Sequence, residues 1–227
     1  MREALVALAL LFIGLTGCAP DMTTFDRFSE SEFVPPAGKG RVVIVLSGSS
    51  GIASYRFAAR DLAAQGYYAV LHDGNLFRNR NPTTHETLRR AISRAQASPH
   101  AIPGKVGAVG YSMGGGAVIG QASSMPDLVA VGIAYYPVTV LSNQADIIRL
   151  WTVPTLALMG EADPNPPVSI DALRAMAEPA RRRGADIELV TYPGTGHDFN
   201  WPDSSLQPAT DDAWRRTLGA LRRHLGS

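Results

Sequence analysis

The stretch from Val106 to Gly116 reads Val-Gly-Ala-Val-Gly-Tyr-Ser-Met-Gly-Gly-Gly and decides the fold. Residues 106–109 form a short apolar run that predicts a buried strand, and the residues from Gly114 onward predict a helix of small side chains. Between these two elements, Gly110 to Gly114 match the pattern G-x-S-x-G. A serine at the tip of so tight a turn has a strained backbone, and side chains two residues before and after it would collide. The pattern therefore predicts that the Ser112 hydroxyl points away from the sheet.

The composition indicates one globular domain. The chain has 227 residues, of which 45% are hydrophobic and 18% are charged, so it is long enough to bury a large core. The formal net charge is +1. Because no basic surplus is available to neutralise phosphates, a nucleic-acid partner is not expected.

The N-terminal residues 1–18 have the pattern of an export signal. The segment from Ala4 to Leu15 carries no charge and is too short to span a bilayer comfortably, but it fits the apolar region of a signal peptide. It ends in Leu15-Thr16-Gly17-Cys18, which resembles the lipobox of bacterial lipoproteins, and Cys18 is the single cysteine of the chain. We expect lipidation at Cys18 and export to the bacterial cell envelope; an ordinary signal peptide is the alternative.

The next segment, residues 19–40, is polar and contains prolines, so it predicts a tether with at most one short edge strand at residues 23–28. A single catalytic domain is expected over residues 41–227. Strand and helix patterns alternate throughout this domain. The expected strands are 42–46, 67–71, 106–109, 129–135, 155–159 and 187–192. The expected helices are 55–65, 85–97 with Thr84 as the cap, 114 onward, 144–150, 170–183 with a kink or break at Pro179, and one after Pro208.

This alternation predicts an α/β fold with a mostly parallel central sheet and helices on both faces. The connection between residues 131 and 155 is short, so no large helical cap is expected over the sheet. Sheets of this kind place their ligands and reactive groups at the carboxyl ends of the strands. That edge of the sheet is therefore where a functional site is expected.

Three polar residues follow three of the expected strands. Ser112, Asp163 and His197 occur in that order, each just beyond the end of a strand. A serine hydroxyl becomes a strong nucleophile when a neutral imidazole accepts its proton, and the imidazole needs a carboxylate to fix its tautomer. Together the three residues predict a catalytic triad, with Glu161 as the alternative acid.

His72 and Asp73 are interpreted as structural or pocket-lining, and one histidine with one aspartate makes no metal site. Trp201 is interpreted either as a wall of the acyl pocket or as an ordinary packing residue.

At this point the sequence resembles a known family. The body from Arg41 to Leu225 is similar to the α/β-hydrolase superfamily, whose members share this order of serine, acid and histidine. More narrowly, Gly110 to Gly115 and the segment Tyr192-Pro193-Gly194-Thr195-Gly196-His197-Asp198-Phe199 resemble the dienelactone hydrolase family. This resemblance implies Ser112 as nucleophile, His197 as base and Asp163 as acid.

Two departures from that family limit what the resemblance implies. Named dienelactone hydrolases carry a cysteine as nucleophile, whereas this chain has Ser112. They also have a His-Glu pair after the first core strand, where this chain has Ser47-Gly48. The resemblance therefore implies ester hydrolysis in general rather than the lactone reaction in particular.

An oxyanion hole needs two backbone N–H groups directed at the developing negative charge. Met113, which follows the serine, is expected to supply one of them. By the resemblance, the second comes from the turn after residues 42–46, where Ser49 is the expected donor and Ser50 the alternative.

The expected function is hydrolysis of small carboxylic esters through an acyl-enzyme intermediate, with no cofactor and no metal. A peptidase or a thioesterase could use the same triad, and a surface-anchored binding module that has lost turnover is the alternative from another class. The expected partners are a small-molecule ester and a membrane, reached through the lipid on Cys18. The sequence does not define the oligomeric state.

The lipobox generates the first prediction. Cys18→Ser removes the only thiol that could carry a diacylglycerol group, so the variant is expected to stay uncleaved or to leave the membrane fraction, since stable anchoring needs more than one acyl chain. Fractionation and the mass of the mature N-terminus check this. A Cys18→Ser protein with unchanged mass and membrane association would contradict lipidation.

Overall fold

The structure is a computed structural model that describes residues 30–201 and 206–226. The expected signal peptide, Cys18 and the expected edge strand at residues 23–28 lie outside the described residues. The strands are β1 Glu30–Phe33, β2 Gly40–Leu46, β3 Tyr68–His72, β4 Ala101–Tyr111, β5 Val129–Tyr135, β6 Thr155–Gly160 and β7 Ile187–Tyr192. The helices are α1 Ile52–Ala64, α2 Pro82–Gln96, α3 Met113–Gly120, α4 Gln144–Leu150, α5 Ile170–Arg182 and α6 Gln207–Leu225, with short 3₁₀ turns η2 Gly74–Phe77 and η3 Ala122–Ser124.

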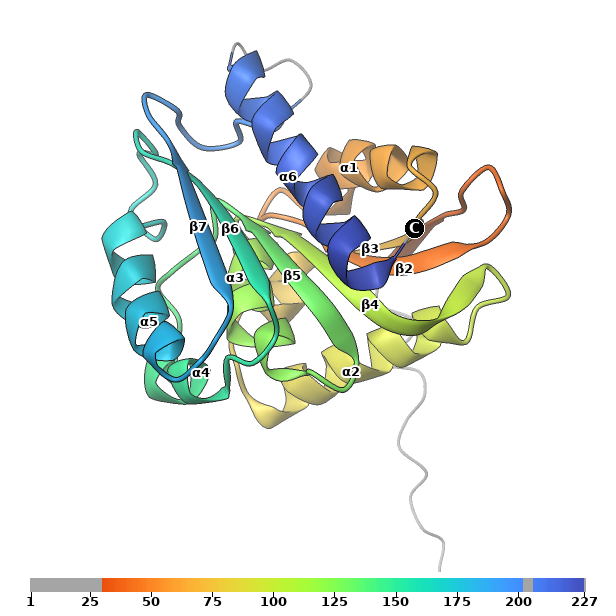
Figure 1. Ribbon diagram of the computed structural model, residues 1–227, viewed down its shortest axis with the longest axis horizontal. Coiled ribbons are helices and arrows are strands. Elements are labelled where there is room, and N and C mark those ends of the chain that lie inside the picture. Colours follow the sequence, from red (N-terminus) through yellow and green to blue (C-terminus); the bar gives the residue numbers. More distant parts are fainter. Residues whose placement is uncertain (1–29, 202–205, 227) are drawn as a thin grey trace, which may run out of the picture.

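The described strands form one seven-stranded sheet in the order β1-β3-β2-β4-β5-β6-β7 (Figure 1). Every neighbouring pair is parallel except β1 with β3. The chain goes from β2 to β3 on one side and then crosses to β4 on the other side of β2. This reversal between β2 and β4 creates a crevice at their carboxyl ends, where Leu46 pairs with Gly110. The segments that follow β2 and β4 therefore lie next to each other.

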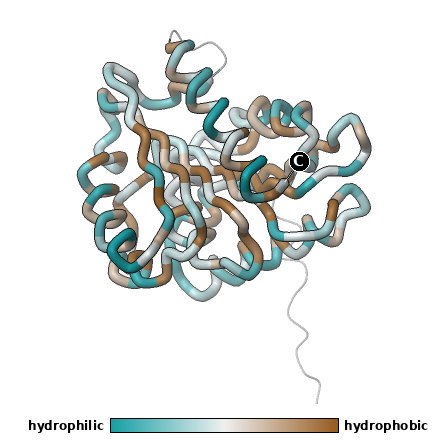
Figure 2. The backbone as a smooth tube through the Cα atoms, in the orientation of Figure 1, coloured by the Kyte–Doolittle hydropathy of each residue, from teal (hydrophilic) through white to brown (hydrophobic). Residues whose placement is uncertain are grey.

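Helices cover both faces of the sheet (Figure 1). On one face, Leu221 of α6 packs over Gly107 of β4, and on the other face Val118 of α3 packs over Gly132 of β5. Because both faces are covered, the buried parts of the central strands are apolar, and Val43, Ile44 and Val45 have no exposed surface. Figure 2 shows the same distribution, with hydrophobic strands inside and hydrophilic stretches on the surrounding helices and loops. The expected α/β fold with a mostly parallel sheet is confirmed.

Several boundaries differ from those expected from the sequence. The sheet includes β1, so part of the segment expected to be a tether is a strand that pairs with β3. Helix α2 begins earlier than expected, because Asn81 is its N-cap and Thr84 is the third helical residue; their side chains form a reciprocal capping box. Helix α5 continues through Pro179, which lies in its last turn and a half.

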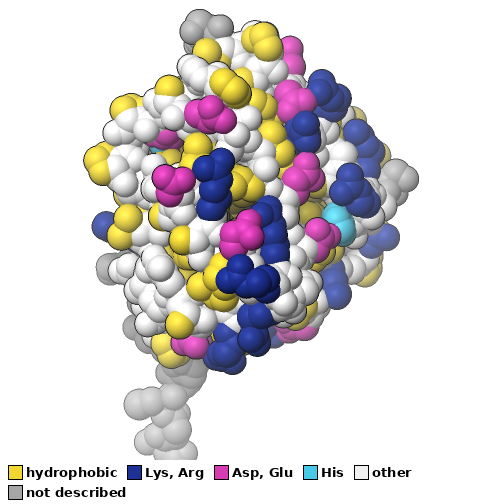
Figure 3. Space-filling view, turned by 60° about the vertical axis from the view of Figure 1, so that its left-hand side comes forward, with side chains coloured by type: hydrophobic (Ala, Val, Ile, Leu, Met, Phe, Trp, Pro, Cys, Tyr) yellow, Lys and Arg dark blue, Asp and Glu magenta, His cyan; other side chains and the backbone are white. Residues whose placement is uncertain are grey.

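No helical cap domain interrupts the described part of the chain, in agreement with the short connection between β5 and β6. None of the helices in residues 30–201 and 206–226 is both long and apolar enough to cross a bilayer. The surface carries both signs of charge in close proximity. Figure 3 shows basic and acidic side chains lying side by side on one face. Among the ion pairs of the surface, Arg216 of α6 pairs with Asp212 and Glu188.

The turn from β4 into α3 is as tight as the G-x-S-x-G pattern predicts. A Cβ atom on Gly110 would lie 2.2 Å from the carbonyl oxygen of Gly114, and a Cβ atom on Gly114 would lie 2.2 Å from the carbonyl oxygen of Leu46. Both collisions are with backbone, which cannot rotate away as a side chain can. Glycine is therefore required at both positions for α3 to begin directly above β4 and beside β2.

The second prediction concerns this turn. Gly110→Ala is expected to lower the free energy of unfolding by at least about 2 kcal/mol, because overpacking against backbone forces the strand and helix apart. Gly219→Ala on α6 is the matched control, since a Cβ there meets nothing within 4 Å; it is expected to raise stability by about 0.5–1 kcal/mol through helix propensity. Urea unfolding checks both variants. Equal stability of Gly110→Ala and wild type would disprove the steric argument.

Candidate active site

Ser112 lies at the tip of the turn between β4 and α3 in a strained conformation. Its φ of 51° is in the left-handed region, with ψ at −106°, which a non-glycine residue adopts only when the surrounding structure holds it there. The backbone on both sides supplies that support. The Ser112 N–H donates to the Tyr135 carbonyl at 3.0 Å, and the Ser112 carbonyl accepts from the N–H groups of Gly116 and Val138, both at 2.9 Å. The residue is 8% exposed, so the surface allows limited access to it.

His197 and Asp163 contact each other directly. Nδ1 of His197 lies 2.6 Å from Oδ2 of Asp163, and the side chains are 17% and 3% exposed respectively. The other carboxylate oxygen of Asp163 accepts from the backbone N–H of Asn165 at 2.9 Å and from its side-chain amide at 3.1 Å. The ionised Asp163 carboxylate can only accept a hydrogen bond, so a neutral His197 carries its proton on Nδ1. The Nε2 atom of His197 is then free to accept a proton.

Glu161, the alternative acid, has a different partner. Its carboxylate accepts from the Thr191 hydroxyl at 2.7 Å, and the residue is exposed. The strand register explains the difference, since Gly160 at the end of β6 pairs with Tyr192 at the end of β7. Glu161 follows immediately and lies beside β7, whereas Asp163, two residues further along, reaches the loop that carries His197.

Ser112 and His197 each contact the end of β5 or the segment that follows it. Ser112 makes backbone hydrogen bonds to Tyr135 and Val138, and the ring of Tyr136 lies 4.4 Å from the ring of His197, centroid to centroid. Tyr136 has a φ of 32°, is completely buried, and donates from its hydroxyl to the side-chain oxygen of Asn200 at 2.5 Å. Tyr136 therefore packs against the histidine and ties its loop to β5.

A second tyrosine connects the histidine loop to α1. The Tyr55 hydroxyl donates to Oδ1 of Asp198 at 3.4 Å, and burial raises the Tyr55 pKa to about 12, so the phenol keeps its proton at neutral pH. Trp201 packs edge-on against Tyr55 at 6.0 Å. Sequence reasoning did not identify Tyr55 or Tyr136, because neither belongs to a motif and each is an ordinary buried aromatic in its own element.

The loop after β2 is fixed to the start of α3. The Gly114 N–H donates to the Ser47 carbonyl at 3.1 Å, and the Ser49 carbonyl accepts from the Asn75 side chain at 3.3 Å. A Cβ on Gly48 would lie 2.3 Å from the Tyr55 hydroxyl, so this loop also packs closely against α1. Met113 opens α3, where the first N–H groups have no acceptor within the helix. The two expected oxyanion donors, Met113 and Ser49, thus come from adjacent segments.

His72 and Asp73 have structural surroundings. His72 is 2% exposed, and burial lowers its pKa to about 4, so it is neutral at physiological pH. Asp73 caps η2 by accepting from the Asn75 N–H at 3.0 Å. In residues 30–201 and 206–226, no three His, Cys, Asp or Glu side chains gather in a way that could hold a metal ion.

Comparison with known proteins gives one family match. The model of the dienelactone hydrolase family matches residues 74–225, which include the three candidate triad residues. A relative from Yersinia pestis named "Putative carboxymethylenebutenolidase" is 26% identical over 211 residues, covering 81% of this chain and 78% of that protein. "Protein usf" of Aquifex pyrophilus is 23% identical over 155 residues. That match covers 66% of this chain, which spans about two thirds (65%) of the length of Protein usf.

Solved structures show the same fold. A protein from Klebsiella pneumoniae described as a "Putative Dienelactone Hydrolase" has a TM-score of 0.68 and 22% identity, over 85% of this chain and 97% of that one. Esterase 2 of Thermogutta terrifontis, in a form phosphorylated by paraoxon, has a TM-score of 0.67 and 18% identity, over 86% of this chain and 88% of that one. At these identities the likeness establishes the α/β-hydrolase fold.

The geometry generates the third prediction. Asp163→Asn is expected to abolish the downfield proton NMR signal of His197 Nδ1–H, because the short charge-assisted hydrogen bond to the carboxylate is lost. Glu161→Gln is the matched control and is expected to leave that signal in place, since Glu161 contacts Thr191 instead. Loss of the signal in Glu161→Gln with retention in Asp163→Asn would contradict the pairing of His197 with Asp163.

Proposed function

Because this chain belongs to the dienelactone hydrolase family, we propose that it hydrolyses carboxylic esters with Ser112 as nucleophile, His197 as general base and Asp163 as the acid of the triad. The observation that carries the proposal is the 2.6 Å contact between His197 Nδ1 and Asp163 Oδ2. Ser112, whose strained backbone is held by β5 and α3, follows β4 at the same edge of the sheet. A packing role alone would not require a buried carboxylate, an imidazole and a strained serine at the ends of three strands.

The reaction follows from the protonation states. Neutral His197 accepts the Ser112 proton at Nε2 while the Ser112 oxygen attacks the ester carbonyl carbon, and the buried Asp163 carboxylate stabilises the imidazolium that forms. The carbon–oxygen bond to the alcohol then breaks, and His197 returns the proton to the departing alkoxide. A water molecule repeats the sequence on the acyl-enzyme, with His197 again taking the proton, and the carboxylic acid is released.

The tetrahedral intermediates carry a negative oxygen, which needs preorganised donors. In the proposal, the N–H groups of Met113 and Ser49 supply them, with Ser50 as the alternative to Ser49. The anchoring of the β2 loop to α3 through Ser47 and Gly114 supports this assignment, because it fixes two backbone segments beside Ser112 before any substrate arrives. Preorganisation of this kind lowers the barrier without a reorganisation cost during the reaction.

The site of action is a separate part of the proposal. The Leu15-Thr16-Gly17-Cys18 motif supports a lipid anchor on Cys18 and a location at the bacterial cell envelope. The catalytic domain would then hydrolyse small-molecule esters while attached to a membrane through its N-terminus.

The fourth prediction tests the triad as one unit. Ser112→Ala and His197→Ala are each expected to lower kcat/KM for a short-chain aryl ester by on the order of 10⁴ to 10⁶, and the double variant by little more, because the two groups act in one proton transfer. Ser93→Ala, on the exposed surface of α2, is the control and is expected to keep full activity. Additive losses in the double variant would contradict a shared step.

Covalent labelling separates an enzyme from a binding module on the same fold. A fluorophosphonate is expected to modify wild type at Ser112 and to leave Ser112→Ala unmodified. A panel of matched esters, amides and thioesters then identifies the leaving group. Absence of labelling in folded wild-type protein, together with no turnover on the whole panel, would overturn the proposed function.

A further inference from the structure

A cavity of about 200 Å³ lies between α1 and α6, above the ends of β4 and β5. Its walls come from the second and third turns of α1, the first two turns of α6 and the last residues of the two strands. Ser112, Asp163 and His197 are not among the residues that line it. The cavity is therefore a space distinct from the triad, on the face of the sheet that α1 and α6 cover.

Aromatic side chains form most of the apolar wall. Phe57 comes from α1, Tyr111 from β4, Tyr135 from β5 and Trp214 from α6. The rings of Tyr111 and Tyr135 stack on each other with their centroids 4.9 Å apart. Aromatic faces carry partial negative charge, so a cavity bounded by several of them attracts a cation as well as an apolar group.

The hydroxyl of Tyr111 makes no hydrogen bond to another described residue and is not a fully enclosed atom, although Tyr111 as a whole is only 1% exposed. By contrast, the neighbouring Tyr135 hydroxyl shares a hydrogen bond with the Thr217 hydroxyl at 2.7 Å. A phenol hydroxyl in apolar surroundings needs water or a ligand as its hydrogen-bond partner when the protein supplies none. Since Tyr111 lines the cavity, a group inside the cavity is the available partner.

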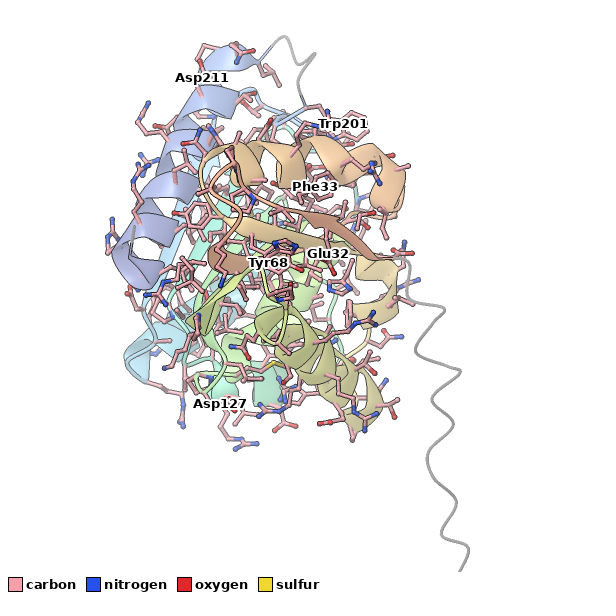
Figure 4. All side chains as sticks on the ribbon, turned by 90° about the vertical axis from the view of Figure 1, so that its right-hand side faces the viewer. Glu32, Phe33, Tyr68, Asp127, Trp201 and Asp211 are labelled. Carbon is pink, nitrogen blue, oxygen red and sulfur yellow. The ribbon has the colours of Figure 1, made fainter. Side chains whose placement is uncertain are left out.

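The charged residues of the lining are both acidic. Asp61 of α1 and Asp211 of α6 border the cavity, and its lining contains no Lys or Arg. Figure 4 shows Asp211 near the beginning of α6. Its carboxylate already accepts from the Gln207 side chain at 2.7 Å. Burial raises the pKa of the Asp61 carboxyl, and burial is also the main cause of the raised pKa of the Tyr111 phenol. Asp61, an exposed residue, and Tyr111 therefore border the same cavity, so one bound group could contact both.

From this arrangement we propose that the cavity binds a small primary amine with an aromatic or branched apolar body. The ammonium group donates to the Asp61 carboxylate and to the Tyr111 hydroxyl oxygen, and the apolar body packs among Phe57, Tyr135 and Trp214. The ligand satisfies the buried phenol and the carboxylate together, which neither an anion nor a neutral hydrocarbon could do. The site is independent of the proposed ester hydrolysis.

Calorimetric titration with benzylammonium tests the proposal, with ethylbenzene as the neutral probe of the same shape. Wild-type protein is expected to bind one benzylammonium at least tenfold more tightly than ethylbenzene. Asp61→Asn is expected to weaken benzylammonium binding at least fivefold, and Asp186→Asn, an exposed carboxylate outside the cavity, is the matched control with unchanged affinity. Tyr111→Phe is expected to weaken binding about threefold, the lower end of the net free energy of one hydrogen bond, whereas Tyr67→Phe, outside the lining, has no effect.

The outcomes are distinct. Equal affinity for the two probes would mean a purely apolar cavity, and no binding of benzylammonium at millimolar concentration would mean no site; either result overturns the proposal. An unchanged affinity in Asp61→Asn overturns it as well, because the ligand would then bind elsewhere. An unchanged affinity in Tyr111→Phe would remove the phenol as an acceptor and overturn the proposed position of the ammonium group. Ester hydrolysis is not part of the readout, so the failure of one proposal leaves the other open to its own test.

Discussion

The close backbone contact between the ends of β2 and β4 is the constraint on which the rest of the structure depends. Gly110 and Gly114 allow α3 to start against the Leu46 carbonyl, at a separation that a Cβ atom would not permit. The Gly114 N–H then bonds to the Ser47 carbonyl, so one hydrogen bond joins the two loops at the switch point of the sheet. The strained backbone of Ser112 is a consequence of this packing, because the chain must reverse direction within a single residue.

The parallel sheet brings residues that are far apart in the sequence close together in space. Strands β4, β5, β6 and β7 are neighbours in that order, so the residues that follow them lie along one edge. Asp163 reaches His197 because β6 and β7 end in register, with Gly160 opposite Tyr192. Tyr136, which follows β5, lies between the segments of Ser112 and His197 and contacts both. The ends of the strands thus position the segments that carry Ser112, Asp163 and His197.

A layer of buried aromatic side chains supports the loop that carries the histidine. Tyr136 bonds to Asn200, Tyr55 bonds to Asp198, and Phe199 is packed between Tyr135 and Tyr192. Each residue from Asp198 to Asn200 is therefore held by a tyrosine of another element. Tyr135 and Asn200 of this layer also line the cavity between α1 and α6.

The sequence by itself determined the alternation of strands and helices, the tight turn at Ser112, and the order of Ser112, Asp163 and His197, because hydrophobic periodicity, glycine sterics and strand ends are local properties. It also placed β5, α4 and β7 at their observed bounds. Only the tertiary structure decided that Asp163 rather than Glu161 contacts His197, that β1 joins the sheet, and that Tyr55 and Tyr136 support the histidine loop. Strand register and the packing of α1 against that loop decide these points. Both depend on contacts between residues far apart in the chain, and a local sequence pattern does not predict such contacts.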